Sequence, residues 1–183
     1  MIKQNKNPWY FYIWFFFVFS IFGWLCEILW FLYEWKELAS RGFMHGPYLP
    51  IYGFGTGFCV LFFKSTYSKK VCIGKLNIKP LLIFLYSFVV LSALEYISAY
   101  LLETVFGMRW WSYDNNKFNL HGRICLKNSI FFGIGGVFTM YFAYPFMRKV
   151  TNRIPVSFLK ISAILIAIIM SADFVLSVIK YLR

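Results

Sequence analysis

The residues best suited to chemistry in this chain lie in two stretches that interrupt long apolar runs. The first, RGFMHGPYLPIYGFGTG (residues 41–57), combines an arginine, a histidine, two prolines and five glycines. The second, GMRWWSYDNNKFNLHGRICL (residues 107–126), carries Arg109 and Arg123 beside several aromatic residues. Guanidinium groups bind carboxylates and phosphates in a bidentate way. The two stretches are therefore the first candidates for a binding site.

Three glutamates add acidic groups within the apolar runs themselves: Glu27, Glu95 and Glu103. Glu95 and Glu103 are eight residues apart, which places them roughly 80° apart around a helix, so both can flank one polar sector. An ionised carboxylate inside a bilayer costs roughly 3 kcal/mol, so each needs a partner. We expect Glu103 to form a salt bridge with Arg109. Two roles are open for Glu95: it could take part in function, or it could be a buried acid that only forms a hydrogen bond between helices.

The composition identifies the setting of these residues as a membrane. Of the 183 residues, 60% are hydrophobic and only 14% are charged, whereas a soluble domain carries about 25% charged residues. The chain is therefore expected to be an integral membrane protein. Its net charge of +12 suits lipid headgroups, and no nucleic-acid partner is expected.

The apolar runs are long enough to supply the spans, since a helix needs about 20 apolar residues to cross the hydrocarbon core. The sequence predicts an all-α, polytopic membrane helix bundle of about five transmembrane helices, with four to six as the range, over residues 9–33, 47–63, 80–106, 124–147 and 156–181. The second is short and begins at Pro47, so a broken or re-entrant helix is the alternative. Residues 1–183 are expected to form a single integral membrane domain.

The basic residues predict the orientation. The N-terminal segment and the second and fourth loops hold more of the 19 lysines and arginines than the opposite loops. The positive-inside rule then favours a cytoplasmic N-terminus. The loops that carry the two candidate stretches would both lie outside.

The glycines and the charged residues of the first stretch suggest different roles. Gly46 followed by Pro47 is typical of a helix start, and Gly53 with Gly57 makes a GxxxG step that favours close helix packing. Packing does not explain Arg41 and His45. We expect one outward-opening cavity formed by Glu27, Arg41, Glu95 and Arg123, with His45, Trp111 and Asn119 at its mouth.

A metal site can be tested on the same residues. His45, His121 and Cys125 with a carboxylate would supply four ligands, but the sequence has no HExxH, CxxC or comparable spacing. No metal and no other cofactor is expected.

Two pieces of the sequence resemble a known family. SRGFMHGPYLPIYGFG and LEYISAYLLETVFGMRWWSYDNNKFNLHGRICL, together with Glu27, are similar to the ABC-transporter type IV (CmpB-like) family of bacterial membrane proteins. The family pattern has an acid in the first helix, then RG, GP and YG.G, and later a run ending in N..G.ICL. This chain departs from it at WSYDN, where the acid, Asp114, follows the tyrosine that it more often precedes.

The resemblance implies a permease-like component of the cell membrane that binds a small anionic or zwitterionic substrate. Any energy would come from a separate ATPase subunit, because this chain has no nucleotide-binding motif. The alternative is an integral membrane enzyme that uses Glu/Arg acid–base chemistry on a lipid-linked or small extracytoplasmic substrate, for which no catalytic signature is present. Other partners would be the lipid bilayer and a small-molecule or lipid-like ligand. The candidate substrate-binding residues are Glu27, Arg41, His45, Glu95, Glu103, Arg109, Trp111, Asn119 and Arg123.

Overall fold

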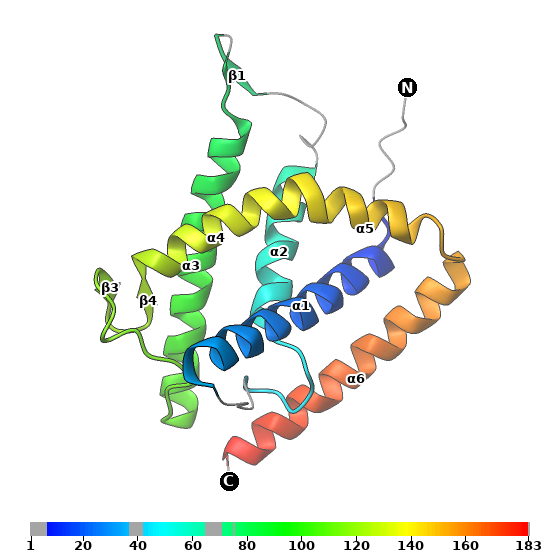
Figure 1. The fold of residues 1–183 in the computed structure, drawn as a ribbon. Helices are drawn as coiled ribbons and strands as arrows, with labels where there is room; N and C mark the ends of the chain where they lie inside the picture. The colour runs from blue at the N-terminus through cyan, green and yellow to red at the C-terminus, as the bar shows by residue number, and fades with distance from the viewer. Residues whose placement is uncertain (1–6, 37–41, 65–70, 75, 183) are drawn as a thin grey trace. The chain divides into compact units, whose positions relative to one another are not determined.

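The structure is a computed structural model that describes residues 7–36, 42–64, 71–74 and 76–182 (Figure 1). Its helices are α1 (Trp9–Trp35), α2 (Pro50–Phe63), α3 (Lys79–Phe106), α4 (Leu126–Phe138), α5 (Tyr144–Thr151) and α6 (Val156–Leu182). A π-helical turn, η2 (Thr139–Ala143), joins α4 to α5. Two short antiparallel hairpins complete the described part, β1 (Cys72–Ile73) with β2 (Leu76–Asn77), and β3 (Asn119–Leu120) with β4 (Ile124–Cys125).

Among the described residues, four helical segments are long and apolar enough to cross a membrane: Trp9–Glu34, Lys79–Phe106, Leu126–Thr151 and Val156–Leu182. The helix α2 is apolar but shorter, with 14 residues. The predicted all-α membrane fold, with a short second helix, is confirmed. The chain is a multi-pass membrane protein.

The surfaces of the long helices are apolar, as lipid contact requires. Of the 18 most hydrophobic consecutive residues of α6, only 17% are buried. Ile161, Ile168 and Leu176 are each about 60% exposed. A soluble protein rarely exposes so continuous an apolar surface. These side chains fit the hydrocarbon core of a bilayer.

The third long segment, Leu126–Thr151, is continuous because a π-helical turn accommodates Pro145. Pro145 has no N–H, and its ring would clash with the carbonyl four residues earlier in a regular α-helix. In the structure, the N–H of Tyr144 bonds instead to the carbonyl of Thr139, five residues back. The wider turn lets α4, η2 and α5 run on as one candidate span.

The chain divides into two compact units, residues 1–53 with 147–183, and residues 54–146. In the first unit, α1 packs against α6, and the indole N–H of Trp14 donates to Ser162 Oγ at 3.2 Å. Met44, Tyr48 and Met170 form a buried apolar cluster there. The expectation of a single membrane domain remains a prediction.

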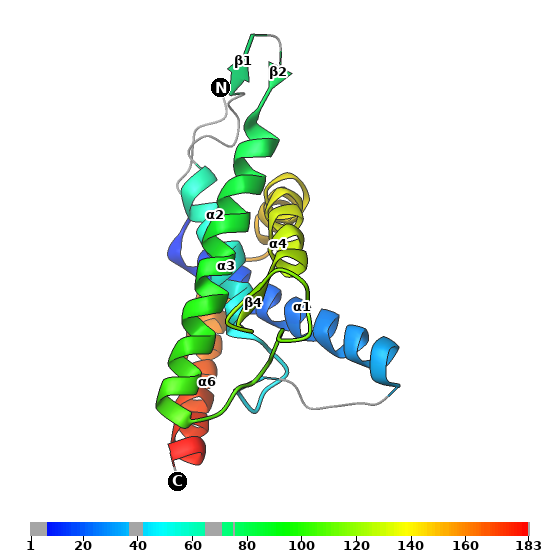
Figure 2. The same ribbon diagram turned by 90° about the vertical axis from the view of Figure 1, so that its left-hand side faces the viewer.

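The second unit is built on α3 and α4, which lie side by side (Figure 2). Small side chains meet where the two helices pack together. Ser92 Oγ donates to Ser129 Oγ at 2.6 Å across the two helices. A Cβ at Gly136 would collide with the side chain of Ser87. Small residues at such positions let helix backbones approach closely, which is how helices associate in lipid.

The start of the second helix differs from the prediction. The helix begins at Pro50 and not at Pro47, because Leu49 N–H bonds to the carbonyl of Ser20 at 2.9 Å and keeps the preceding residues outside the helix. The predicted packing role is confirmed for Gly53, where a Cβ would meet Ser20 and the backbone of Phe16. A Cβ at Gly57 would meet no described atom within 4 Å.

Candidate functional site

The loop that follows α3 owes its position to the way the helix ends. Gly107 adopts a left-handed conformation, with φ of 68°, and its N–H bonds to the carbonyl of Glu103 at 2.9 Å. Glycine is the residue best suited to this helix cap. The chain reverses there, so that Arg109 comes back over the last turn of α3.

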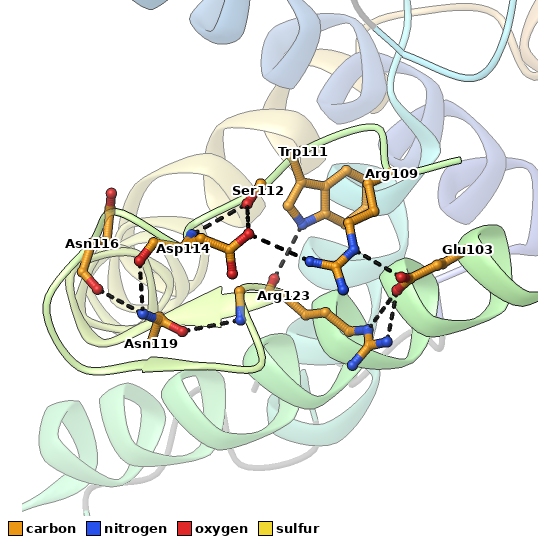
Figure 3. Close-up of polar contacts among 9 residues, drawn as sticks. Glu103, Arg109, Trp111, Ser112, Asp114, Asn116, Asn119 and Arg123 are labelled. Carbon is orange, nitrogen blue, oxygen red and sulfur yellow. Dashed lines mark hydrogen bonds and ion pairs between the residues drawn. The ribbon is translucent and has the colours of Figure 1, made fainter. Parts of the chain in front are cut away.

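The carboxylate of Glu103 holds two arginines (Figure 3). Arg109 Nε donates to Oε1 at 2.8 Å, while Arg123 donates to Oε2 through Nη2 at 2.7 Å and Nε at 3.1 Å. The predicted salt bridge between Glu103 and Arg109 is confirmed, and Arg123 is a second partner of the same acid. Two guanidinium groups and one carboxylate leave one net positive charge in this group of three.

Arg123 is the more enclosed of the two arginines. Its side chain is 16% exposed, compared with 40% for Arg109. Its guanidinium lies 5.5 Å from the ring centres of both Tyr96 and Tyr100, a distance at which cation–π attraction acts. Hydrogen bonds to Glu103 raise the pKa of Arg123 further above its ordinary value, so this charge is permanent.

Tryptophans border the same group. The indole N–H of Trp111 donates to the carbonyl of Arg123 at 3.1 Å. A cavity of about 10 Å³ is lined by Ala99, Leu102, Glu103, Arg109, Trp110, Trp111 and Arg123. This volume holds at most one water molecule. A larger ligand could enter only if Glu103 and an arginine separated.

Asn119 shapes the loop from within. Its side-chain amide donates to the carbonyls of Asn116 at 2.9 Å and Asp114 at 3.3 Å, and its oxygen accepts the N–H of Gly122 at 3.0 Å. Gly122 has φ of 65°, and a Cβ there would collide with the carboxylate of Asp114. Asn119 thus holds the hairpin that delivers Arg123 to Glu103.

Asp114, the residue that departs from the family pattern, has polar partners in this loop. Its Oδ2 accepts the hydroxyl of Ser112 at 2.6 Å and lies 3.5 Å from Nη1 of Arg109. Its side chain is 62% exposed. It is a weak, solvated second partner of Arg109.

Glu95 ties the loop to the middle of α3. The side chain is buried, and Oε1 accepts the hydroxyl of Tyr113 at 2.8 Å. The amide of Asn128 on α4 donates to the same hydroxyl at 2.5 Å. This chain of hydrogen bonds joins α4, the loop and α3.

A separate polar cluster lies in the first unit, around Asp173 of α6. Oδ1 accepts the ring Nδ1 of His45 at 2.9 Å, the N–H of His45 at 3.2 Å and the hydroxyl of Ser177 at 3.4 Å. Oδ2 accepts the N–H of Gly46 at 3.0 Å and the hydroxyl of Tyr48 at 2.5 Å. Burial and the hydrogen bond to Asp173 raise the pKa of Tyr48, so the phenol stays a donor.

Asp173 was not among the predicted site residues. The signal that could have found it is its position, since an acid in the middle of an apolar span needs a partner. The partner itself could not be read from the sequence, because His45 is 128 residues away.

The remaining predicted residues are placed in part. Glu27 accepts the hydroxyl of Tyr52 at 2.9 Å within the first unit, and Arg41 lies outside the described residues. The shared cavity that would join Glu27 and Arg41 to Glu95 and Arg123 therefore stays a prediction. Among the described residues, no three His, Cys, Asp or Glu side chains gather as metal ligands would.

Four long apolar helices, with polar clusters of arginine, acid and aromatic side chains, define a polytopic helical membrane protein. A sequence model of the family described as Putative ABC-transporter type IV matches residues 14–178. The chain belongs to that family. No curated protein and no solved structure matches it.

Proposed function

We propose that this protein is a permease-like component that binds a small anionic or zwitterionic solute at Arg109 and Arg123. The observation that carries the proposal is the convergence of both guanidinium groups on the single carboxylate of Glu103, at 2.8 and 2.7 Å. The group of three keeps one net positive charge, which Asp114 offsets only in part because its carboxylate is 62% exposed and lies 3.5 Å from Arg109. A solute carboxylate or phosphate is the group that this charge attracts.

The surroundings of the arginines support a site for a solute with an apolar part. Trp110 and Trp111 line the small cavity beside Glu103, and Tyr96 and Tyr100 lie under the guanidinium of Arg123. Aromatic faces contribute apolar contact and favour a positively charged group, as in a zwitterion.

The cavity is too small for a solute while Glu103 bridges the two arginines. Binding would therefore be an exchange, in which the anionic group of the solute replaces Glu103 on Arg109, the more exposed arginine. Two of the other predicted substrate-binding residues, Glu95 and Asn119, hold the loop in place. Glu27 and His45 belong to the other unit of the chain, and Arg41 lies outside the described residues.

Membership of an ABC-transporter family supports a separate ATPase as the source of energy. The sequence contains no phosphate-binding GxxxxGK[ST] loop of its own. We therefore place the chain as the membrane partner of a nucleotide-hydrolysing subunit.

A ligand screen on the purified protein tests the proposal. Inorganic phosphate, small mono- and dicarboxylates and zwitterionic amino acids would be added singly, and the thermal unfolding temperature followed in detergent. We expect at least one of them to raise the Tm of the wild type and of Arg153→Gln, but not of Arg123→Gln. Arg153 is the matched control because it is an exposed arginine outside the cluster. Equal stabilisation of all three proteins, or of none, would refute binding at this site.

A further inference from the structure

A shallow groove at the start of α4 is separate from the arginine cluster. It has a volume of about 510 Å³ and is lined by Asn116, Lys117, Phe118, Leu126, Lys127 and Ile130. We propose that this groove binds one acidic phospholipid of the surrounding bilayer, with its phosphate at Lys117 and Lys127 and an acyl chain along Phe118, Leu126 and Ile130.

The groove is positively charged and therefore favours an anionic lipid headgroup. Two of its six lining residues are lysines and none is acidic. Both lysines are exposed. The first turn of α4 contains no acidic residue and its N-cap, Cys125, makes no side-chain cap, so the positive end of the helix dipole adds to the same field. An anionic phosphate complements this arrangement, and a zwitterionic headgroup complements it less.

The apolar side of the groove, formed by Phe118, Leu126 and Ile130, favours a lipid over a soluble anion. Phe118 is 80% exposed, and Leu126 and Ile130 are each about 40% exposed. Leu126 is also the first residue of a candidate membrane span. Lysines beside the start of a span lie at the depth of lipid headgroups, and the apolar side chains next to them lie at the depth of the first acyl carbons.

The groove is preformed by hydrogen bonds between its two walls. The N–H of Leu126 donates to the carbonyl of Phe118 at 3.1 Å, and the amide of Asn116 donates to Sγ of Cys125 at 3.5 Å. Phe118 is held with a positive φ of 54°, which is rare for an aromatic residue. A rigid site loses less conformational entropy when a lipid chain binds to it.

Native mass spectrometry of the full-length protein in detergent tests this site. The protein would be mixed with equal amounts of phosphatidylglycerol and phosphatidylcholine of identical chains, and the two singly lipid-bound species compared. We expect the wild type to retain phosphatidylglycerol in preference by on the order of tenfold. Lys117→Gln/Lys127→Gln should bind the two lipids almost equally. Lys149→Gln/Lys160→Gln, which removes two exposed lysines elsewhere, should keep the preference.

A third variant tests the acyl-chain wall. Phe118→Asn leaves both lysines in place and suits the positive φ of this position, so it should fold normally and retain less of either lipid. The site is refuted if the Lys117/Lys127 variant keeps the preference or if the control variant loses it equally. A lipid occupant is refuted if Phe118→Asn retains as much lipid as the wild type while millimolar inorganic phosphate displaces phosphatidylglycerol. The arginine cluster takes no part in these outcomes, so they are independent of the proposed transport function.

Discussion

Glu103, at the end of α3, forms ion pairs with two arginines. The charge balance between this one acid and its two basic partners determines whether the cluster can attract an anion. A carboxylate with one arginine is a neutral pair, whereas one shared by Arg109 and Arg123 leaves an arginine charge that only Asp114, a 62% exposed acid 3.5 Å from Arg109, offsets in part. The more exposed guanidinium, that of Arg109, is available to an incoming anion. The more enclosed one, that of Arg123, fixes the loop.

The first prediction concerns the strength of these two contacts. Arg123→Gln should lower the Tm in detergent by several degrees and by more than Arg109→Gln, because Arg123 donates two hydrogen bonds to Glu103 and is less exposed. The double variant Glu103→Gln/Arg123→Gln should lose less stability than the sum of the losses of the two single variants, since the stability effects of contacting residues do not add.

The control for this coupling is the double variant Glu103→Gln/Lys149→Gln, because Lys149 lies outside the cluster. The stability losses of these two single changes should add in the double variant. Strict additivity for Glu103 and Arg123 as well would show that the two side chains do not share an interaction in the folded protein.

The second prediction concerns Asp173, whose two oxygens accept hydrogen bonds from the 45–48 turn. Asp173→Asn replaces one acceptor oxygen by an amide nitrogen, so some of these donors lose their partner. The expected loss is about 2 kcal/mol of unfolding free energy, as for hydrogen bonds to charged groups. Chemical unfolding in mixed micelles would measure it.

Asp114→Asn is the matched control for that change, because its side chain is 62% exposed. It should have a smaller effect. If Asp173→Asn proved as mild as Asp114→Asn, Asp173 would not anchor the turn to α6.

At the scale of the elements, α3 and α4 form a pair that depends on small residues along one helix face. The contacts of Ser87 with Gly136 and of Ser92 with Ser129 bring the two helices together. The loop and the β3–β4 hairpin then connect the ends of the same two helices. The packing of these helices therefore sets the distance between Glu103 on α3 and Arg123 beside α4.

The third prediction compares two adjacent glycines of α4. Gly136→Ala should destabilise the protein by about 1–3 kcal/mol, because its methyl group would overlap Ser87. Gly135→Ala should be neutral or slightly stabilising, because a Cβ there meets no described atom within 4 Å and alanine favours the helix. Unfolding curves of the two variants decide this, and equal effects would contradict the packing of α3 on α4.

The elements show how far the sequence alone could lead. The long apolar runs predicted four spans to within a few residues, because length and hydropathy are local properties. The contact between Glu103 and Arg109 was also predictable, since the two residues are only six positions apart and a turn at Gly107 lies between them. The contact between Glu103 and Arg123 was not, because it needs the β3–β4 hairpin, whose register no local pattern fixes.

At the scale of the whole molecule, the apolar surface of the helices places the chain in a bilayer, and its basic residues favour one orientation. The fourth prediction is that the loop around Asn116 faces the outside of the cell and that Cys72 faces the cytoplasm. In a variant without other cysteines, a cysteine at Asn116 should react with a membrane-impermeant maleimide on intact cells. Cys72 alone should react only after the cells are opened, and the reverse pattern would invert the topology.

The most direct test of the central claim is the effect of Glu103→Gln on anion affinity. Glutamine keeps an oxygen that can accept from one arginine but removes the negative charge that competes with a solute. Titration calorimetry at fixed salt would use the anion that most stabilises the wild type in the ligand screen. If the cluster is an anion-binding site, Glu103→Gln should bind the anion with a lower Kd than the wild type does, even though the variant is less stable. An unchanged or higher Kd would contradict the account and leave the cluster as a static clamp on the loop.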